Sequence, residues 1–264
     1  MTRVHPVATA GFAAGAEVYE RARPSYPVEA VEWMAERTGL GPGTTIVDLG
    51  AGTGKLTRLL PPIGARVVAV EPLPEMRAQL LRVVAGVEVL DGTAEEVPLP
   101  DAAADVIVVA QAFHWFDFDR ALPELHRVLR PGGHLVLFWN MRDLDDRLQA
   151  GVEALLRPLR EQVMAEHEGS WRGSLEHTPY FEPAEERHFR YEQRFTVADL
   201  CDRVASTSFV AAMPTDEREA LLVRVRALAD GLPEPFPFPY RTDVLVIPRS
   251  SDRVGRARGT SIKG

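Results

Sequence analysis

The chain has almost no cysteine, no long apolar run and no excess of positive charge, and each shortage excludes a class of protein. Cys201 is the only cysteine among 264 residues, so an intramolecular disulfide and a cysteine-cluster metal site are both excluded. No segment approaches the roughly 18 to 20 apolar residues that a membrane-spanning helix needs, and no apolar signal core is recognisable. We therefore expect a cytoplasmic protein that does not bind membranes.

The net charge also limits the partners. The formal charge of −8 argues against nucleic acid, because binding to nucleic acid depends on neutralising phosphates with Lys and Arg. Residues 249–264 are a basic exception and read as a flexible tail. A small molecule is the expected partner, and no pattern indicates an oligomeric state.

Residues 44–140 alternate short β-branched runs with helical patterns, which predicts a Rossmann-like, doubly wound α/β fold with a mostly parallel sheet. The runs IVDL, VVAV, VIVVA and LVLFW lack polar alternation, as expected for strands that are buried on both faces. Arg130-Pro131-Gly132-Gly133 predicts a sharp stop between a helix that ends near Leu129 and the next strand.

The rest of the chain predicts a cap on a single domain, 1–264. The expected parts are an N-terminal cap segment (1–43), the cofactor-binding core (44–140), a largely helical cap with one sheet strand (141–230) and a final antiparallel strand (240–248). Pro158 interrupts one helical pattern, and four prolines just before the last strand predict irregular structure there.

A glycine-rich segment follows the first predicted strand, at the turn into a helix where doubly wound sheets bind ligands. Gly50, Gly52 and Gly54 alternate in the string that begins at Asp48, and glycine lets the backbone bend sharply and approach a ligand. A dinucleotide-binding turn has the form G-x-G-x-x-G/A. Here the third glycine comes one position earlier, and Lys55 stands where that pattern requires a small residue. A pyrophosphate therefore fits this turn poorly.

Residues 46–54 resemble the first motif of the class I S-adenosylmethionine-dependent methyltransferases, hh-D/E-x-G-x-G-x-G. The resemblance implies S-adenosylmethionine as the cofactor, with Asp48 near its amino group and the loop, Ala51 included, around its methionyl and ribose parts. Glu71, followed by Pro72, ends the second strand where the family has an acid that accepts bonds from two ribose hydroxyls. A dehydrogenase also places an acid at this point, and a solvated strand-end glutamate is a further interpretation.

The stretch 91–105 resembles the family's G-D-A-E-x-L-P-F-P-D segment. This implies that Thr93 and Ala94 contact the adenine ring. Thr93 stands where the family has an acid, so it offers a hydroxyl in place of a charged acceptor.

The string 111–117, QAFHWFD, follows the fourth strand and resembles the A-x-H-W-F segment of small-molecule methyltransferases of the trans-aconitate type. Residues 19–27 resemble the opening of that subfamily, in which a tyrosine and an arginine fold over the cofactor. The likeness covers residues 16–140 and adds Tyr19 and Gln111 to the implied cofactor contacts.

Methyl transfer from a sulfonium is an in-line displacement, so the protein mainly positions the acceptor and excludes water. For a carboxylate acceptor, Arg23 or Arg142 would supply the orienting cation. A hydroxyl or amine would need a base, and His114 is the candidate because the unperturbed pKa of histidine is near neutral; a packing role for His114 stays equally open. The expected substrate contacts are Tyr26, Trp115, Trp139, Asn140 and Arg142. Trp139 also fits ordinary core packing.

Three alternatives remain. The chain could bind the cofactor without transferring a methyl group, since binding is not catalysis. A nicotinamide-dependent oxidoreductase is opposed by the early third glycine and the lack of a Tyr-x-x-x-Lys pair. An RNA or protein methyltransferase is opposed by the negative charge and the absence of an N-P-P-Y tetrapeptide. The histidines of the cap lack metal-ligand spacing, so no metal is expected.

Overall fold

The computed structural model describes residue 20 and residues 23–164 and 171–251, in which strands alternate with helices. The strands are β1 (Thr45–Leu49), β2 (Arg66–Val70), β3 (Glu88–Leu90), β4 (Ala104–Ala110), β5 (Leu129–Arg142), β6 (Glu185–Phe195) and β7 (Phe236–Pro248). The α-helices are α3 (Val28–Thr38), α4 (Pro74–Val83), α5 (Phe118–Val128), α6 (Arg147–Met164), α7 (Trp171–Glu176), α8 (Val197–Ala205), α9 (Ser208–Ala211) and α10 (Thr215–Leu228). Three short 3-10 turns are η1 (Thr57–Leu59), η2 (Pro61–Ile63) and η3 (Phe113–Trp115).

The strands form one seven-stranded sheet in the order β3-β2-β1-β4-β5-β7-β6. The first five are parallel, β7 is antiparallel to β5, and β6 is antiparallel to β7. The strand order reverses between β1 and β4, and such a reversal opens a crevice at the carboxyl ends of the strands. The predicted Rossmann-like, mostly parallel fold with an antiparallel C-terminal strand is confirmed.

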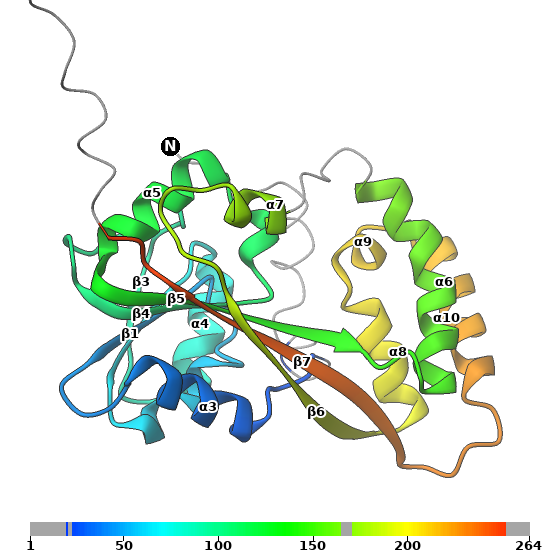
Figure 1. Cartoon of the computed structure of the whole chain (residues 1–264). Coiled ribbons are helices and arrows are strands. Elements are labelled where there is room, and N and C mark those ends of the chain that lie inside the picture. Colours follow the sequence, from blue (N-terminus) through cyan, green and yellow to red (C-terminus); the bar gives the residue numbers. More distant parts are fainter. Residues whose placement is uncertain (1–19, 21–22, 165–170, 252–264) are drawn as a thin grey trace, which may run out of the picture.

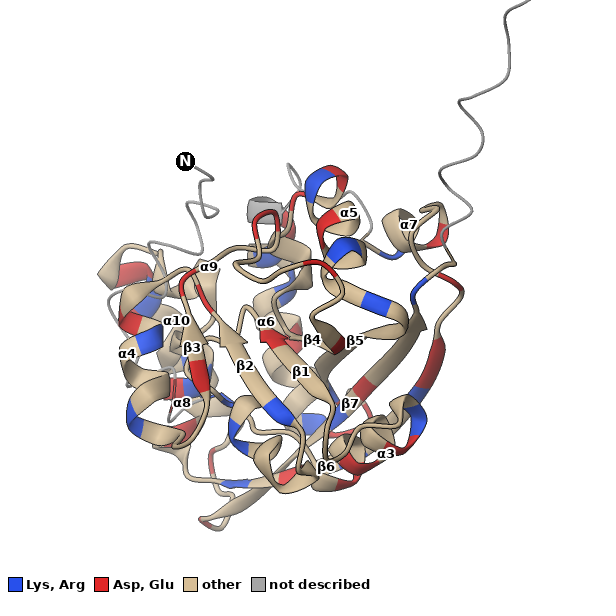
Figure 2. Cartoon of the chain, turned by 90° about the vertical axis from the view of Figure 1, so that its left-hand side faces the viewer, with Lys and Arg blue, Asp and Glu red and all other residues tan. Residues whose placement is uncertain are grey.

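Helices cover both faces of the parallel part because its strands are apolar on both sides. Helix α5 packs with Leu122 and Leu125 on one face, and α3 packs with Trp33 and Met34 on the other. Helix α3 ends at Gly39, whose φ of 67° closes it in a left-handed cap. In the parallel part of the sheet, the charged residues lie mainly at the ends of the strands (Figure 2).

A second group of helices lies at the far end of the β6–β7 ribbon (Figure 1). Helices α6, α8, α9 and α10 share a separate apolar core with that ribbon, to which Leu156, Val204 and Phe238 belong. Helix α8 starts with a capping box in which Thr196 and Asp199 satisfy each other's backbone N–H groups. No helix in the described part of the chain is long and apolar enough to cross a membrane.

Pro233 and Pro235 precede β7 outside regular structure, as predicted, but Pro237 and Pro239 lie within the strand, so that part of the prediction is wrong. The strand predicted to begin at Tyr240 begins at Phe236 and pairs with β6 through Pro237 and Pro239. Strand β5 ends opposite Tyr240, so this part of β7 has a neighbour on one side only. The Pro239 carbonyl accepts a bond from Gln149 Nε2 at 2.6 Å, and a proline whose missing N–H faces that open side removes no ladder bond.

Two boundaries also differ from the sequence-based expectation. The glycine loop is followed by η1 and η2 in place of the predicted α-helix, because Pro61 and Pro62 cannot donate the amide bonds that an α-helix needs. Strand β5 begins at Leu129, and its register shifts before His134. The four residues from Arg130 to Gly133 are therefore an irregular start of this strand, and α5 ends at Val128 as predicted to within one residue.

Candidate active site

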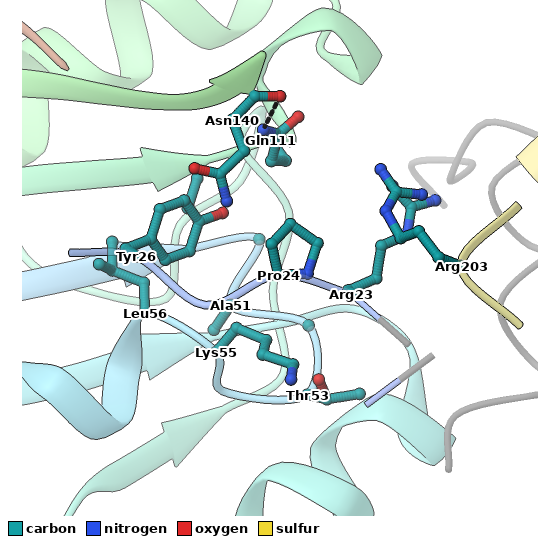
Figure 3. Close-up of a pocket in the computed structure, with 13 residues that line it drawn as sticks. Arg23, Pro24, Tyr26, Ala51, Thr53, Lys55, Leu56, Gln111, Asn140 and Arg203 are labelled. Carbon is teal, nitrogen blue, oxygen red and sulfur yellow. Dashed lines mark hydrogen bonds between the residues drawn. The ribbon is translucent and has the colours of Figure 1, made fainter. Parts of the chain in front are cut away.

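A cavity of about 60 Å³ lies where the strand order reverses, and we call it the loop cavity (Figure 3). It combines the glycine loop, the end of β4 and the segment that precedes α3. Its lining residues are Arg23, Pro24, Tyr26, Gly50, Ala51, Gly52, Thr53, Lys55, Leu56, Ala110, Gln111, Asn140 and Arg203. Figure 3 shows Arg23 and Arg203 extending to the same side of this cavity.

The three glycines of the loop have different surroundings. All have positive φ: 68° at Gly50, 57° at Gly52 and 85° at Gly54. A Cβ added to Gly50 would lie 2.9 Å from Ala112 Cβ, whereas one added to Gly52 would meet nothing within 4 Å. A Cβ on Gly54 would press on Leu80 and Val84 at the end of α4. Gly50 and Gly52 therefore line the cavity, and Gly54 brings the loop close to α4.

Asp48 lies beneath the loop and is 1% exposed. Its Oδ2 accepts a bond from Thr57 Oγ1 at 2.6 Å, and its Oδ1 has no hydrogen-bond partner among the described residues. Burial raises the pKa of Asp48 from 3.8 to about 7, and the nearby Glu71 carboxylate adds to this rise while the Thr57 bond opposes it. Asp48 is thus a buried acid with one unsatisfied acceptor.

Glu71 ties the glycine loop to the end of β2. Its Oε2 accepts a bond from the Gly52 amide and its Oε1 one from the Leu73 amide, both at 2.9 Å. The side chain is buried, which raises its pKa, although the two amide bonds oppose the rise. Each oxygen keeps a second lone pair that can accept a hydroxyl. The interpretation of Glu71 as a solvated strand-end residue is wrong.

The residues predicted to hold the adenine ring do not line the loop cavity. Thr93 Oγ1 is buried and has no partner among the described residues, and Thr93 forms an isolated bridge with Glu96. Ala94 is 3% exposed and belongs to the core beneath α5. Pro72 is half-buried beside Glu71. Contacts of Pro72, Thr93 and Ala94 with a cofactor stay predictions.

A second cavity, of about 230 Å³, lies between the sheet and the cap helices, and we call it the cap cavity. Its lining residues are Arg23, Gln111, His114, Trp115, Arg142, Leu156, Arg160, Arg203, Thr207, Ser208 and Phe209. Three of these, Arg23, Gln111 and Arg203, also line the loop cavity. The two cavities therefore meet at these three side chains.

Gln111 ends β4 at this junction with a left-handed backbone, φ 58°. A side chain other than glycine pays a steric cost in this conformation, and such strain concentrates at functional sites. The strain is held by two bonds: Gln111 N donates to Phe138 O at 3.0 Å, and Gln111 Nε2 donates to Asn140 O at 3.2 Å. The backbone thus fixes the amide of Gln111 between the two cavities.

The aromatic residues after β4 form a stack behind the cap cavity. His114 lies 4.4 Å from Trp115 and 5.4 Å from Trp139, measured between ring centroids, and Trp139 stacks on Trp171 at 5.3 Å. His114, the predicted base, and Trp115, a predicted substrate contact, both line the cap cavity, and both roles stay predictions. Trp139 lines neither of the two cavities and supports His114 from behind.

The segment before α3 is fastened across the loop cavity. Asn140 Nδ2 donates to Ser25 O at 2.9 Å, and Asn140 Oδ1 accepts from Thr242 Oγ1 at 2.6 Å. Tyr26, predicted to touch the substrate, packs edge-on against Phe138 and lines the loop cavity. Tyr26 and Asn140 thus lie on the predicted cofactor side. Tyr19, a predicted cofactor contact, lies outside the described residues.

Comparisons with known proteins agree with this geometry. Residues 47–137 match a family model described as a methyltransferase domain. An uncharacterized methyltransferase of Mycobacterium tuberculosis is 42% identical over 218 residues, which cover 83% of this chain and 84% of that protein. One of Schizosaccharomyces pombe is 31% identical over 242 residues, which cover 89% and 94% of the two chains. The chain belongs to the methyltransferase family.

Solved structures of other proteins have the same fold as this methyltransferase. A putative type II methyltransferase from Anaeromyxobacter dehalogenans superposes with a TM-score of 0.59 at 27% sequence identity, over 86% of this chain and 97% of that one. A putative methyltransferase from Anabaena variabilis superposes with a TM-score of 0.57 at 22% identity, over 85% and 98% of the two chains. The second likeness supports the fold alone.

Sequence reasoning missed several cavity residues of the methyltransferase, above all Arg203 and Arg160 of the cap. Arg203 is 8% exposed and lies on α8 beside the buried Leu200 and Val204. An arginine on the apolar face of a helix is a signal that could have been noticed. Thr53 and Lys55 were also missed, although they continue the glycine motif.

Among the residues that the structure describes, one group of side chains has the spacing to hold a metal ion: Glu186, His188 and Asp243. His188 Nδ1 lies 2.8 Å from Asp243 Oδ1, a pairing that the spacing along the chain did not indicate. Both Asp243 oxygens also accept bonds from Arg241, at 2.7 and 3.0 Å. The guanidinium already balances the charge of this carboxylate, so the group is an ion-pair network on β6 and β7.

Proposed function

We propose that this methyltransferase uses S-adenosylmethionine to methylate a small-molecule acceptor that presents a carboxylate. The observation that carries the proposal is the meeting of the loop cavity and the cap cavity at Arg23, Gln111 and Arg203. In-line transfer needs donor and acceptor on opposite sides of one short gap. A cytoplasmic location and the absence of nucleic-acid and membrane partners remain parts of this proposal.

The polar groups in and beneath the glycine loop suit the cofactor. Asp48 and Glu71 lie next to the loop cavity and are not among its lining residues; the unpartnered Oδ1 of Asp48 can accept a bond from an ammonium group, and Glu71 keeps lone pairs for vicinal hydroxyls. Lys55 lines the cavity, and its Nζ lies 3.5 Å from Glu20 Oε1. When bound, the cofactor supplies an electrophilic methyl group on a sulfonium. The chain contributes position, charge complementarity and the exclusion of water.

The cap cavity suits an anionic acceptor. Arg203 lies at the junction, and Arg142 lines the cap cavity further on. A guanidinium can hold a carboxylate by two parallel bonds and so aim one oxygen at the methyl group. A carboxylate is already nucleophilic, so no base is required.

The first test is titration calorimetry of the full chain with S-adenosylhomocysteine, NAD and NADP. We expect binding of S-adenosylhomocysteine alone. Glu71→Gln should weaken it about tenfold, because a charge-assisted bond is replaced by a neutral one. Glu75→Gln, in the exposed first turn of α4, makes the same charge change away from the loop and should leave binding unchanged.

Two other outcomes would contradict the proposal. Nicotinamide binding without S-adenosylhomocysteine binding would replace the proposal with an oxidoreductase. Binding of S-adenosylhomocysteine with no methylation of any carboxylic acid offered would contradict the carboxylate acceptor and leave a hydroxyl or amine acceptor, or a cofactor-binding protein without transfer activity.

Replacing His114 tests whether a base takes part. We expect His114→Gln to lower kcat for a carboxylic-acid acceptor by less than tenfold, since a lost general base typically costs about 10² to 10⁴. The measurement is kcat from pH 6 to 9 for both proteins. A kcat loss of a thousandfold together with loss of a titration near neutral pH would show that His114 is a base and that the acceptor is a hydroxyl or an amine.

A further inference from the structure

The arginines of the cap cavity occupy two places. Arg23 and Arg203 line both cavities and so lie at the junction. Arg142 and Arg160 line only the cap cavity. Arg142 is 15% exposed and Arg160 is 42% exposed, measured on the side chains, so the second place extends to the mouth.

Arg142, Arg160 and Arg203 have one carboxylate between them among the described residues. Glu153 Oε1 lies 2.6 Å from Arg160 Nη2, and Glu153 Oε2 lies 3.5 Å from Arg142 Nε. Arg203 bonds neutral oxygens instead: Nε donates to Tyr240 Oη at 3.2 Å and Nη1 to Thr207 Oγ1 at 3.5 Å. Arg142 and Arg160 against Glu153 leave one positive charge in excess at the second place. At the junction, Arg203 is joined by Arg23, whose Nη2 donates to Ser206 O at 2.8 Å.

Burying these positive charges close together is electrostatically unfavourable. Burial and the neighbouring Arg203 and Arg23 lower the pKa of Arg142 to about 10, with burial the larger cause. Arg142 Nε is buried and makes no hydrogen bond in the described part of the chain. Like charges that are buried together do not stabilise a fold, and such clusters are typical of sites that bind the opposite charge.

We propose that the acceptor carries two anionic groups, one at Arg203 and the other at Arg142 and Arg160. The inference rests on the proposed function for the chemistry at the junction. There, a carboxylate oxygen forms a bond to the methyl carbon while the carbon–sulfur bond breaks, its electron pair stays on sulfur, and no proton is released. The group at Arg142 and Arg160 is not methylated and serves as the anchor.

One anionic group at the junction and a second at Arg142 and Arg160 complement the positive charge of the two places. A dicarboxylate and a carboxylate with a phosphate ester share this chemistry, and Glu153 pairs with Arg142 and Arg160 for either. Because Arg160 is partly exposed, solvent screens its contribution more than that of Arg142.

The test is calorimetry of the full chain, saturated with S-adenosylhomocysteine, against propionate, succinate, glutarate and phosphoglycolate. We expect at least one of succinate, glutarate and phosphoglycolate to bind about tenfold more tightly than propionate, because a second charge-assisted contact is added. Comparing the affinities for succinate and glutarate with that for phosphoglycolate shows whether the second anionic group is a carboxylate or a phosphate ester.

Single variants locate the two places. Arg142→Gln should weaken the dianion about tenfold and Arg160→Gln about threefold, and both should weaken propionate by a smaller factor. Arg203→Gln should weaken all of these anions. Arg157→Gln is the matched control. Arg157 is an exposed residue of the same helix as Arg160, and the substitution removes the same charge. Arg142→Lys, which keeps the charge, should recover part of the dianion affinity and shows that the Arg142→Gln loss is not misfolding.

Equal affinity for propionate and every dianion would overturn the proposal, as would an Arg142→Gln variant that folds and behaves like Arg157→Gln. The readout is binding, so it does not depend on turnover. Loss of S-adenosylhomocysteine binding in the unaltered chain would instead contradict the proposed function, and the four anions would then be titrated without it.

Discussion

Gly50→Ala should weaken S-adenosylhomocysteine binding about a hundredfold, since a misplacement of about 1 Å at a positioning loop can cost that much. The new Cβ would meet Ala112 Cβ at 2.9 Å, in a backbone with φ 68°. Left-handed strain and overpacking together should also lower the free energy of unfolding by about 2 to 4 kcal/mol. Calorimetry and urea denaturation measure the two effects.

Gly39→Ala separates strain from crowding. Its φ of 67° is nearly the same, but a Cβ there meets nothing within 4 Å, and the residue caps α3 away from both cavities. We expect a loss of stability of about 1 kcal/mol and unchanged binding. If Gly50→Ala bound S-adenosylhomocysteine as tightly as Gly39→Ala, the loop would not be the cofactor site.

Asp48→Asn should stabilise the protein at pH 8 and weaken cofactor binding at the same pH. Burial raises the pKa of Asp48 from 3.8 to about 7, so the folded chain binds this proton more tightly than the unfolded chain. The free energy of unfolding therefore falls as the pH rises through this window. At pH 8 the ionised carboxylate costs about 3 to 4 kcal/mol, which the amide avoids while keeping an acceptor for Thr57.

Urea denaturation from pH 4 to 8.5 tests this, with the unaltered chain and Asp48→Asn compared at each pH. The difference should be near zero at pH 4 and largest at pH 8. Affinity for S-adenosylhomocysteine should rise with pH up to about 7 in the unaltered chain, because the ionised acid pairs with the ammonium. In the variant it should be about ten- to a hundredfold lower at pH 8 and flat. A stability difference that is independent of pH would contradict the assignment.

The parallel half of the fold was predictable because its signals are local. Four apolar runs, a glycine turn and the stop after α5 fix the strands and their burial. The start of β7 was not predictable, because the tolerance for Pro237 and Pro239 depends on β5 ending opposite Tyr240. Where β5 ends depends on how the strands pair in the sheet, and the sequence of residues 233–240 alone does not contain that information.

The candidate site also has a part that the sequence predicts and a part that it does not. Asp48 and Gly50 belong to one short motif, and Glu71 ends the next strand, so each was visible in a local pattern; the bond from the Gly52 amide to Glu71 joins the two places. Arg160 and Arg203 come from α6 and α8, and their approach to Arg142 depends on how the cap packs against β7. No pattern along the chain encodes that approach.

Strand β6 is the edge strand at one end of the sheet, and its charged residues affect how two copies of the chain can associate. Six of its eleven residues, Glu185, Glu186, Arg187, Arg190, Glu192 and Arg194, carry a formal charge. An open strand edge is a template for pairing with another chain, and charged side chains along it make that pairing unfavourable. The long β6–β7 ribbon that supports the cap therefore also discourages edge-to-edge aggregation.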